Sequence, residues 1–167
     1  MRFLLCLTFL FFALPTDNRI DHRLLPIVSE FYYMKTGKIV DDYSITVHIG
    51  KLEDPHWVGV CRQGIFGTEI TIGEEFYNNN SYLQVHSTVF HELGHCVLGK
   101  GHNPPVGWQD VRSIKTLMQY IDVLRGRPVE EFMKDGCPIS IMYYAQFSDY
   151  CYMKHYVEYM EELFGKK

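Results

Sequence analysis

The segment from His91 to His102 holds the residues whose types and spacing are best suited to chemistry. It contains the pattern His-Glu-x-x-His, in which His91 and His95 are four residues apart and Glu92 follows the first histidine. On a helix, residues four apart lie on one face, so both imidazoles can reach one metal ion. Zinc accepts imidazole ligands, and a catalytic zinc site keeps one position for water. The pattern therefore predicts a zinc site in which Glu92 takes the proton of the zinc-bound water.

A third histidine follows this predicted helix after a turn that contains two glycines. Gly101 directly precedes His102, and Gly99 lies three residues before it. Glycine lets a chain reverse after a helix, because it adopts the left-handed conformation without steric cost. We therefore expect His102 to return to the metal as the third ligand.

The whole segment resembles the zinc-binding motif of the metzincin metallopeptidases, HExxHxxGxxH. His102 lies eleven residues after His91 instead of ten, and Leu98 stands where the motif has glycine, so the turn is one residue longer. The chain is similar to small exported bacterial metallopeptidase-like proteins that carry HELGHC and a later SIM segment. The resemblance spans roughly residues 58–164. It implies a zincin-like fold, zinc as the cofactor and a peptide or protein as the substrate.

Metzincins also have a methionine-containing turn beneath the zinc, and two methionines are candidates for it. Met142 lies in the segment SIMYY at 140–144, which follows turn-forming residues, and the resemblance favours it. Met118 is the alternative, but it lies inside a predicted helix. By the same resemblance, Tyr144 is expected to act at the metal or on the oxyanion, as a second catalytic residue beside Glu92.

These residues are consistent with functions of different kinds. The first is a zinc endopeptidase that hydrolyses peptide bonds. In the second, the chain is still a hydrolase, but Asp110, Glu130 or Glu131 replaces His102 as the third ligand. In the third, zinc only stabilises an exported binding module without activity. Structural zinc sites have four protein ligands, and the sequence offers three good ones, so the pattern favours the peptidase.

Composition and the N-terminal segment indicate one exported domain. The chain has 167 residues, a length typical of a single domain, and a net charge of −4 that gives no sign of nucleic-acid binding. Residues 1–16 have the pattern of a signal peptide, because Arg2 precedes an apolar run too short to span a bilayer. We therefore expect a single metallopeptidase domain at 17–167 that is secreted or periplasmic, monomeric and not inserted in a membrane.

Loss of the signal peptide would remove Cys6 and leave four cysteines, an even number that predicts two disulfides in an exported protein. Three pairings are possible. We favour Cys61–Cys96, which would join the central helix to the preceding strand region, and Cys137–Cys151, which would join two C-terminal neighbours. Because none of them has Cys-x-x-Cys spacing, a thiolate zinc site is not expected.

The elements that must position these residues are predicted from periodicity and cap residues. Helices are expected at 24–35, 81–98, 110–124 and 148–164, and strands at 44–49, 57–61 and 68–72. The last helix carries a core-facing stripe of Tyr152, Tyr156, Tyr159 and Leu163. Strands come early and helices late, so the predicted fold class is α+β: a small mixed β-sheet, an active-site helix and a C-terminal helix.

Two further expectations concern the surroundings of the site. By the resemblance, strand 68–72 is an edge strand of the cleft with which an extended peptide would pair, although its short alternation is equally typical of a core strand. The histidines without metal-ligand spacing are expected to be exposed or hydrogen-bonded within the fold. They are His22, His48, His56, His86 and His155.

Overall fold

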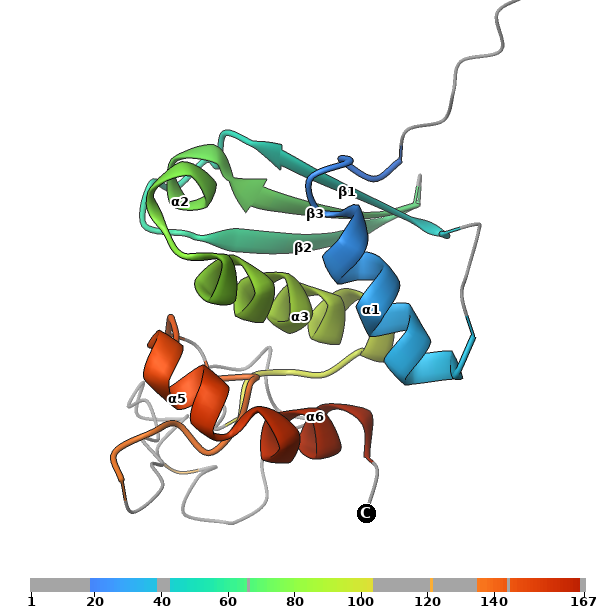
Figure 1. Ribbon diagram of the computed structural model, residues 1–167. Helices are drawn as coiled ribbons and strands as arrows, with labels where there is room; N and C mark the ends of the chain where they lie inside the picture. Colours follow the sequence, from blue (N-terminus) through green and yellow to red (C-terminus); the bar gives the residue numbers. More distant parts are fainter. Residues whose placement is uncertain are drawn as a thin grey trace, which may run out of the picture.

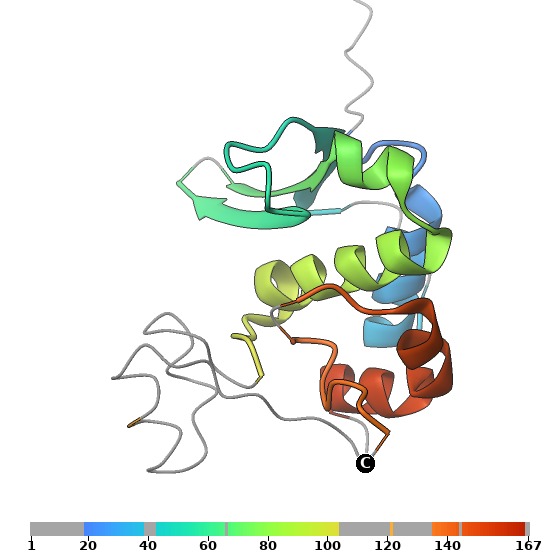
Figure 2. The same cartoon turned by 90° about the vertical axis from the view of Figure 1, so that its left-hand side faces the viewer.

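The computed structural model describes residues 19–38, 43–65, 67–103, 121, 135–143 and 145–165. Its elements are α1 (Leu25–Thr36), β1 (Ile45–Gly50), β2 (Gly59–Gly64), β3 (Gly67–Gly73), α2 (Glu74–Asn79), α3 (Tyr82–Leu98), α5 (Asp149–Lys154) and α6 (Tyr156–Phe164). They form three layers (Figures 1 and 2): the sheet, then α3 with α1 beside it, then α5 and α6 on the far side of α3. The α+β class with a small mixed sheet is thereby confirmed.

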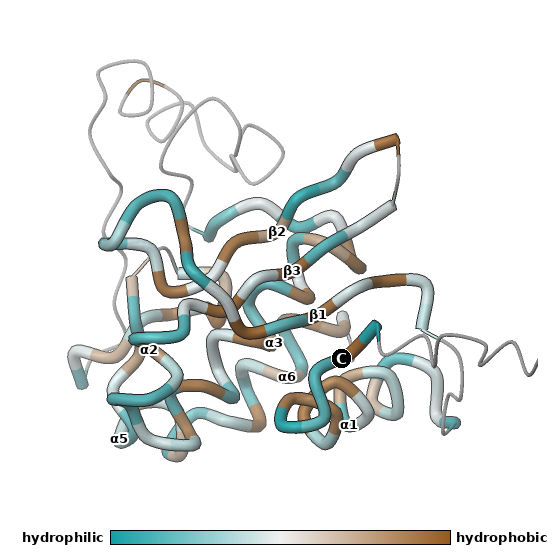
Figure 3. The backbone as a smooth tube through the Cα atoms, turned by 90° about the horizontal axis from the view of Figure 1, so that it is seen from above, coloured by the Kyte–Doolittle hydropathy of each residue, from teal (hydrophilic) through white to brown (hydrophobic). Residues whose placement is uncertain are grey.

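The sheet has the strand order β1-β3-β2, with β1 parallel and β2 antiparallel to β3. Hydropathy alternates along β1 (Figure 3), and Ile70 and Ile72 of β3 are fully buried. The expectation that strand 68–72 is an edge strand is therefore wrong, because β1 and β2 pair with its two sides, and the core-strand interpretation is confirmed. Residues 19–21 pair with the outer side of β1 through Val47. Among the described residues, β2 has a strand neighbour on one side only.

The predicted active-site helix is α3, and both of its ends have the expected caps. Ser81 and Gln84 form a capping box, in which the Gln84 backbone N–H donates to the Ser81 hydroxyl at 3.1 Å. Gly99 is left-handed, with φ of 64°, and the Lys100 N–H donates to the Gly94 carbonyl at 3.0 Å. The helix thus continues to Leu98, and the chain then turns sharply.

The C-terminal segment forms two helices where one was expected. Ser148 caps α5 as predicted, but His155 has φ −112° and ψ 20° and separates α5 from α6. At this break the His155 imidazole lies 2.7 Å from the Asp135 carboxylate, a contact between residues distant in sequence. The core-facing stripe is confirmed for Tyr152, Tyr159 and Leu163, which are buried, whereas Tyr156 is half-buried.

Helix α2 was not expected, because the polar run at 78–81 indicates a break between the last strand and the central helix. Two glutamates in its first turn suit the positive end of a helix. The Asn79 and Asn80 side-chain amides donate to the carbonyls of Glu75 and Phe76 at 2.9 Å. The asparagine run therefore ends this helix instead of forming a loop.

Both favoured disulfides are present, Cys61–Cys96 between β2 and α3 and Cys137–Cys151 between α5 and the segment before it. The expected signal peptide at 1–16 and most of the expected helix at 110–124 lie outside the described residues. Within the described ranges, no helix has the length and apolar character needed to cross a membrane.

Candidate metal centre

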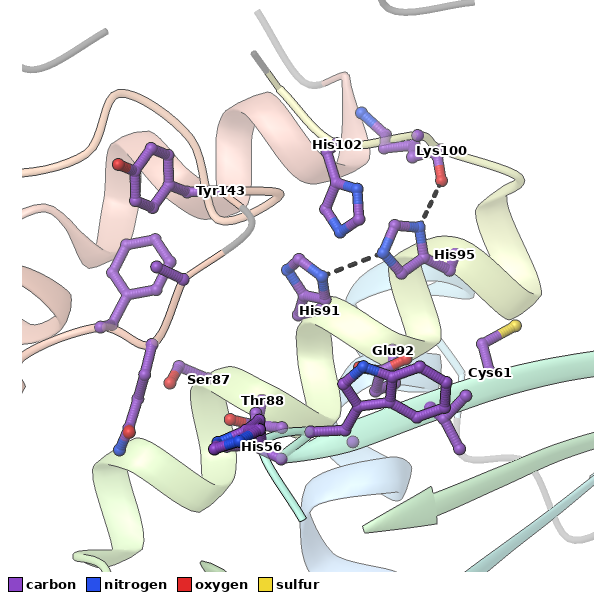
Figure 4. Close-up of a pocket in the computed structure, with 18 of the residues that line it drawn as sticks. His56, Cys61, Ser87, Thr88, His91, Glu92, His95, Lys100, His102 and Tyr143 are labelled. Carbon is purple, nitrogen blue, oxygen red and sulfur yellow. Dashed lines mark hydrogen bonds between the residues drawn. The ribbon is translucent and has the colours of Figure 1, made fainter. Parts of the chain in front are cut away.

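The structure brings His91, His95 and His102 together near the C-terminal end of α3 (Figure 4). One possible ligand atom from each imidazole lies within 4.8 Å of the other two. His91 and His95 project from one face of α3, and His102 reaches them because the chain reverses at Gly99. The turn that is one residue longer than in the metzincin motif therefore still brings the third imidazole to the first two.

Backbone carbonyls orient two of the three imidazoles. His91 Nδ1 donates to the Ile141 carbonyl at 2.9 Å, and His95 Nδ1 donates to the Lys100 carbonyl at 2.7 Å. A carbonyl only accepts, so Nδ1 carries a proton, and in the neutral imidazole Nε2 then carries the lone pair. The two Nε2 atoms lie 2.9 Å apart, close enough to face one shared ion. This donor set fits zinc, which binds neutral imidazole nitrogen.

Glu92 lies on the face of α3 that meets β2 and is 6% exposed. A Cβ atom built on Gly59 of β2 would lie 2.9 Å from the carboxyl oxygen Oε1, so the strand backbone packs directly against the Glu92 side chain. Burial raises the pKa of Glu92 to about 8, although a hydrogen bond from the Cys61 backbone acts in the opposite direction. The carboxyl is therefore poised to exchange a proton near neutral pH.

This pKa shift predicts that the metal-free protein loses stability as the pH rises from about 4.5 to about 8. The folded state holds the Glu92 proton more tightly than the unfolded state, whose carboxyl has its ordinary pKa of 4.5. The resulting contribution to the free energy of unfolding is therefore fully present below pH 4.5, and it is lost as the pH rises to about 8. Each pKa unit corresponds to about 1.4 kcal/mol, which gives a loss on the order of a few kcal/mol.

Urea unfolding of the metal-free wild type and of Glu92→Gln across this pH range isolates the effect, because both proteins share every other titrating group. The free energy of unfolding of the variant minus that of the wild type should increase with pH. A difference that stays constant would contradict the assigned pKa of Glu92.

Met142 lies in a turn that packs against α3 near the imidazoles. It is fully buried, and a Cβ atom on Gly94 would lie 2.5 Å from its sulfur, so the methionine occupies the space that glycine leaves. The Ser140 hydroxyl accepts from the Met142 N–H at 3.0 Å and shapes the turn. The neighbouring Ile141 carbonyl is the one that orients His91. Met118, the alternative, lies outside the described residues.

A cleft of about 780 Å³ opens over the three imidazoles and Glu92. The loop before β2 and β2 itself form one wall, with His56 and the half-exposed Trp57. Tyr143 and residues 145–147 form another part of the lining. No local pattern predicts these lining residues, because the fold brings them together from segments more than eighty residues apart.

Several expected residues are placed as predicted or lie outside the described residues. His86 is buried and bonded to the Tyr152 hydroxyl at 2.7 Å, and His48 lies 3.2 Å from the Thr71 hydroxyl, so both are satisfied within the fold. The second catalytic candidate, Tyr144, is outside the described residues, as are the alternative ligands Asp110, Glu130 and Glu131.

A second cluster of metal-ligand types, Asp135, Cys137 and His155, lies in the C-terminal layer. The Cys137 sulfur is bonded to Cys151 and is not a thiolate. Asp135 bonds Lys154 at 2.8 Å and His155 at 2.7 Å, which holds the pKa of Asp135 well below its usual range. The cluster is therefore explained as a salt-bridged anchor beside a disulfide.

Comparisons of the whole chain with protein-family models, with curated proteins and with solved structures each found no match.

Proposed function

We propose that the protein is a zinc-dependent endopeptidase of the metzincin type, with His91, His95 and His102 as zinc ligands and Glu92 as the general base. The observation that carries this proposal is the convergence of the three imidazoles at an open cleft, directly beside a buried carboxyl. Zinc ligands and a general base in this combination are typical of metal-assisted hydrolysis.

The roles of the chain's own residues follow from their positions. Zinc, when bound by the three imidazoles, would supply a Lewis acid that makes water acidic and polarises the scissile carbonyl. The Ile141 and Lys100 carbonyls hold the His91 and His95 rings in the orientation that presents Nε2. Glu92 takes a proton from the attacking water and then gives it to the departing amine nitrogen.

The open cleft supports a catalytic zinc site over a structural one. A structural zinc ion has four protein ligands and is closed to solvent, whereas three candidate ligands line this cleft among the described residues. A cleft with Trp57, Tyr143 and Phe147 in its lining suits a peptide segment with apolar side chains.

Metal analysis combined with a digestion assay tests the proposal. The purified protein is expected to contain a single zinc ion per chain and to cleave an unfolded protein substrate. A chelator should abolish cleavage, and added zinc should restore it, because the ion supplies the Lewis acid. A protein that holds zinc firmly but cleaves nothing would instead identify the zinc-stabilised binding module.

A further inference from the structure

Strand β2 runs along α3 so that two rows of residues face one another. Thr88, Glu92 and Cys96 are four residues apart and share one face of α3. On β2, Gly59 packs against Thr88 and Glu92, and Cys61 is bonded to Cys96. Farther along, the Gln63 amide donates to the Cys96 carbonyl at 2.9 Å. The strand therefore meets the helix face that carries the general base at three alternate residues, Gly59, Cys61 and Gln63.

The backbone of β2 forms the wall against the Glu92 carboxyl. At Gly59, a single added carbon would lie 2.9 Å from both Cγ and Oε1 of Glu92, which leaves no space for carboxyl movement on that side. The Cys61 N–H hydrogen-bonds the same carboxyl. The position of Glu92 thus depends on β2 staying against α3.

The zinc ligands are held by other segments. The carbonyls that orient His91 and His95 belong to Ile141 and Lys100, neither of which is in β2. A displacement of β2 would therefore disturb the general base and leave the orientation of these two imidazoles unchanged.

Strand β2 depends on its disulfide more than a central strand would. Among the described residues it pairs with β3 alone, and its last three residues are exposed. The Cys61–Cys96 disulfide is the covalent link between β2 and α3, and it joins them one helical turn from Glu92. Without that link, the exposed edge would open more readily.

Building on the proposed function, we infer that the Cys61–Cys96 disulfide positions Glu92 for catalysis, so that its reduction lowers peptide hydrolysis while zinc stays bound. A trialkylphosphine avoids the zinc chelation of a dithiol: it gives two electrons to the disulfide and becomes a phosphine oxide, while water supplies the oxide's oxygen and the two protons of the cysteine thiols. Reduction frees β2 to move, so that the Glu92 carboxyl loses its packing against Gly59 and its interaction with the Cys61 N–H. Misplacing a catalytic group by about 1 Å costs roughly 100-fold in rate.

The chain offers a matched control in its second disulfide. Cys137–Cys151 joins α5 to the segment before it, and α5 lies on the other side of α3 from β2 (Figure 1). The test compares Cys61→Ala/Cys96→Ala with Cys137→Ala/Cys151→Ala, each loaded with zinc and assayed well below its unfolding temperature. We expect kcat to fall roughly 10–100-fold in the first variant only, with zinc affinity unchanged in both. Wild-type activity should fall on reduction and return on reoxidation.

Three outcomes would overturn the inference: an unchanged kcat in Cys61→Ala/Cys96→Ala, an equal fall in both variants, or loss of zinc together with activity. The rate of amide hydrogen exchange at residue 61 reports on β2 without requiring activity. It therefore distinguishes failure of this inference from failure of the proposed function. If the zinc-loaded wild type cleaves nothing, the proposed function is wrong, but the structural part is still tested. Faster exchange at residue 61 in the first variant alone supports the positioning by the disulfide, and unchanged exchange contradicts it.

Discussion

Replacing Glu92 by Gln is expected to lower kcat for peptide hydrolysis by roughly 10²–10⁴-fold while zinc remains bound. Glutamine has nearly the same shape as glutamate, so it fills the space between α3 and β2 without carrying the carboxylate that accepts a proton. The three imidazoles and their carbonyl partners are untouched by the change. Cleavage of a fluorogenic peptide and zinc content, measured on the same preparation, check both halves of the expectation.

A matched control for this change is Glu75→Gln, which neutralises an exposed carboxyl on α2. It should leave both zinc content and kcat at the wild-type level. Cleavage that survived in Glu92→Gln would exclude Glu92 as the general base. Loss of zinc from Glu92→Gln would show instead that the carboxyl supports metal binding, and the proposed division of roles would be wrong.

Replacing His102 by Ala is expected to reduce zinc affinity by at least about 100-fold. Loss of an outer partner of a ligand usually costs about 10–100-fold, and loss of a ligand itself should cost more. His102 contributes one of the three converging nitrogen atoms, and the other two stay in place on α3. Competition with a zinc chelator of known affinity measures the change.

His48→Ala is the control for His102→Ala, because His48 lies on β1 and contacts Thr71 and Glu69 of β3. Zinc affinity should be unaffected in that variant. Unchanged affinity in His102→Ala would exclude this histidine as a ligand. The search for the third ligand would then turn to Asp110, Glu130 and Glu131, the carboxylates that the sequence also allows.

The parts of the site that could be predicted are those encoded within a few residues. Helix geometry places His91 and His95 on one face of α3, and Gly99 predicts the turn that brings His102 back toward them. Contacts between segments distant in the sequence have no such local pattern and could not be predicted. The alternation at Ile70 and Ile72 does not say whether a strand is central or at an edge, because both kinds bury one face.

The same distinction applies to the rest of the fold. Caps at Ser81 and Ser148 gave helix starts, because each cap acts on the backbone two or three residues away. The break at His155 could not be predicted, since Asp135, its partner, lies twenty residues earlier. Trp57 and Phe147 both line the cleft, but they come from the sheet side and the C-terminal side of α3, so no local pattern links them.

The anchors of the two helix-borne imidazoles differ in a way that bears on the order of folding. The carbonyl that orients His95 is five residues away, whereas the carbonyl that orients His91 is fifty residues away. Contacts of short loop length form early, and those of long loop length form late. A chain emerging from synthesis would therefore contain all three histidines well before His91 is oriented. Under the proposed function, the zinc ligand set therefore gains its last orienting contact only when the 140–143 turn docks against α3.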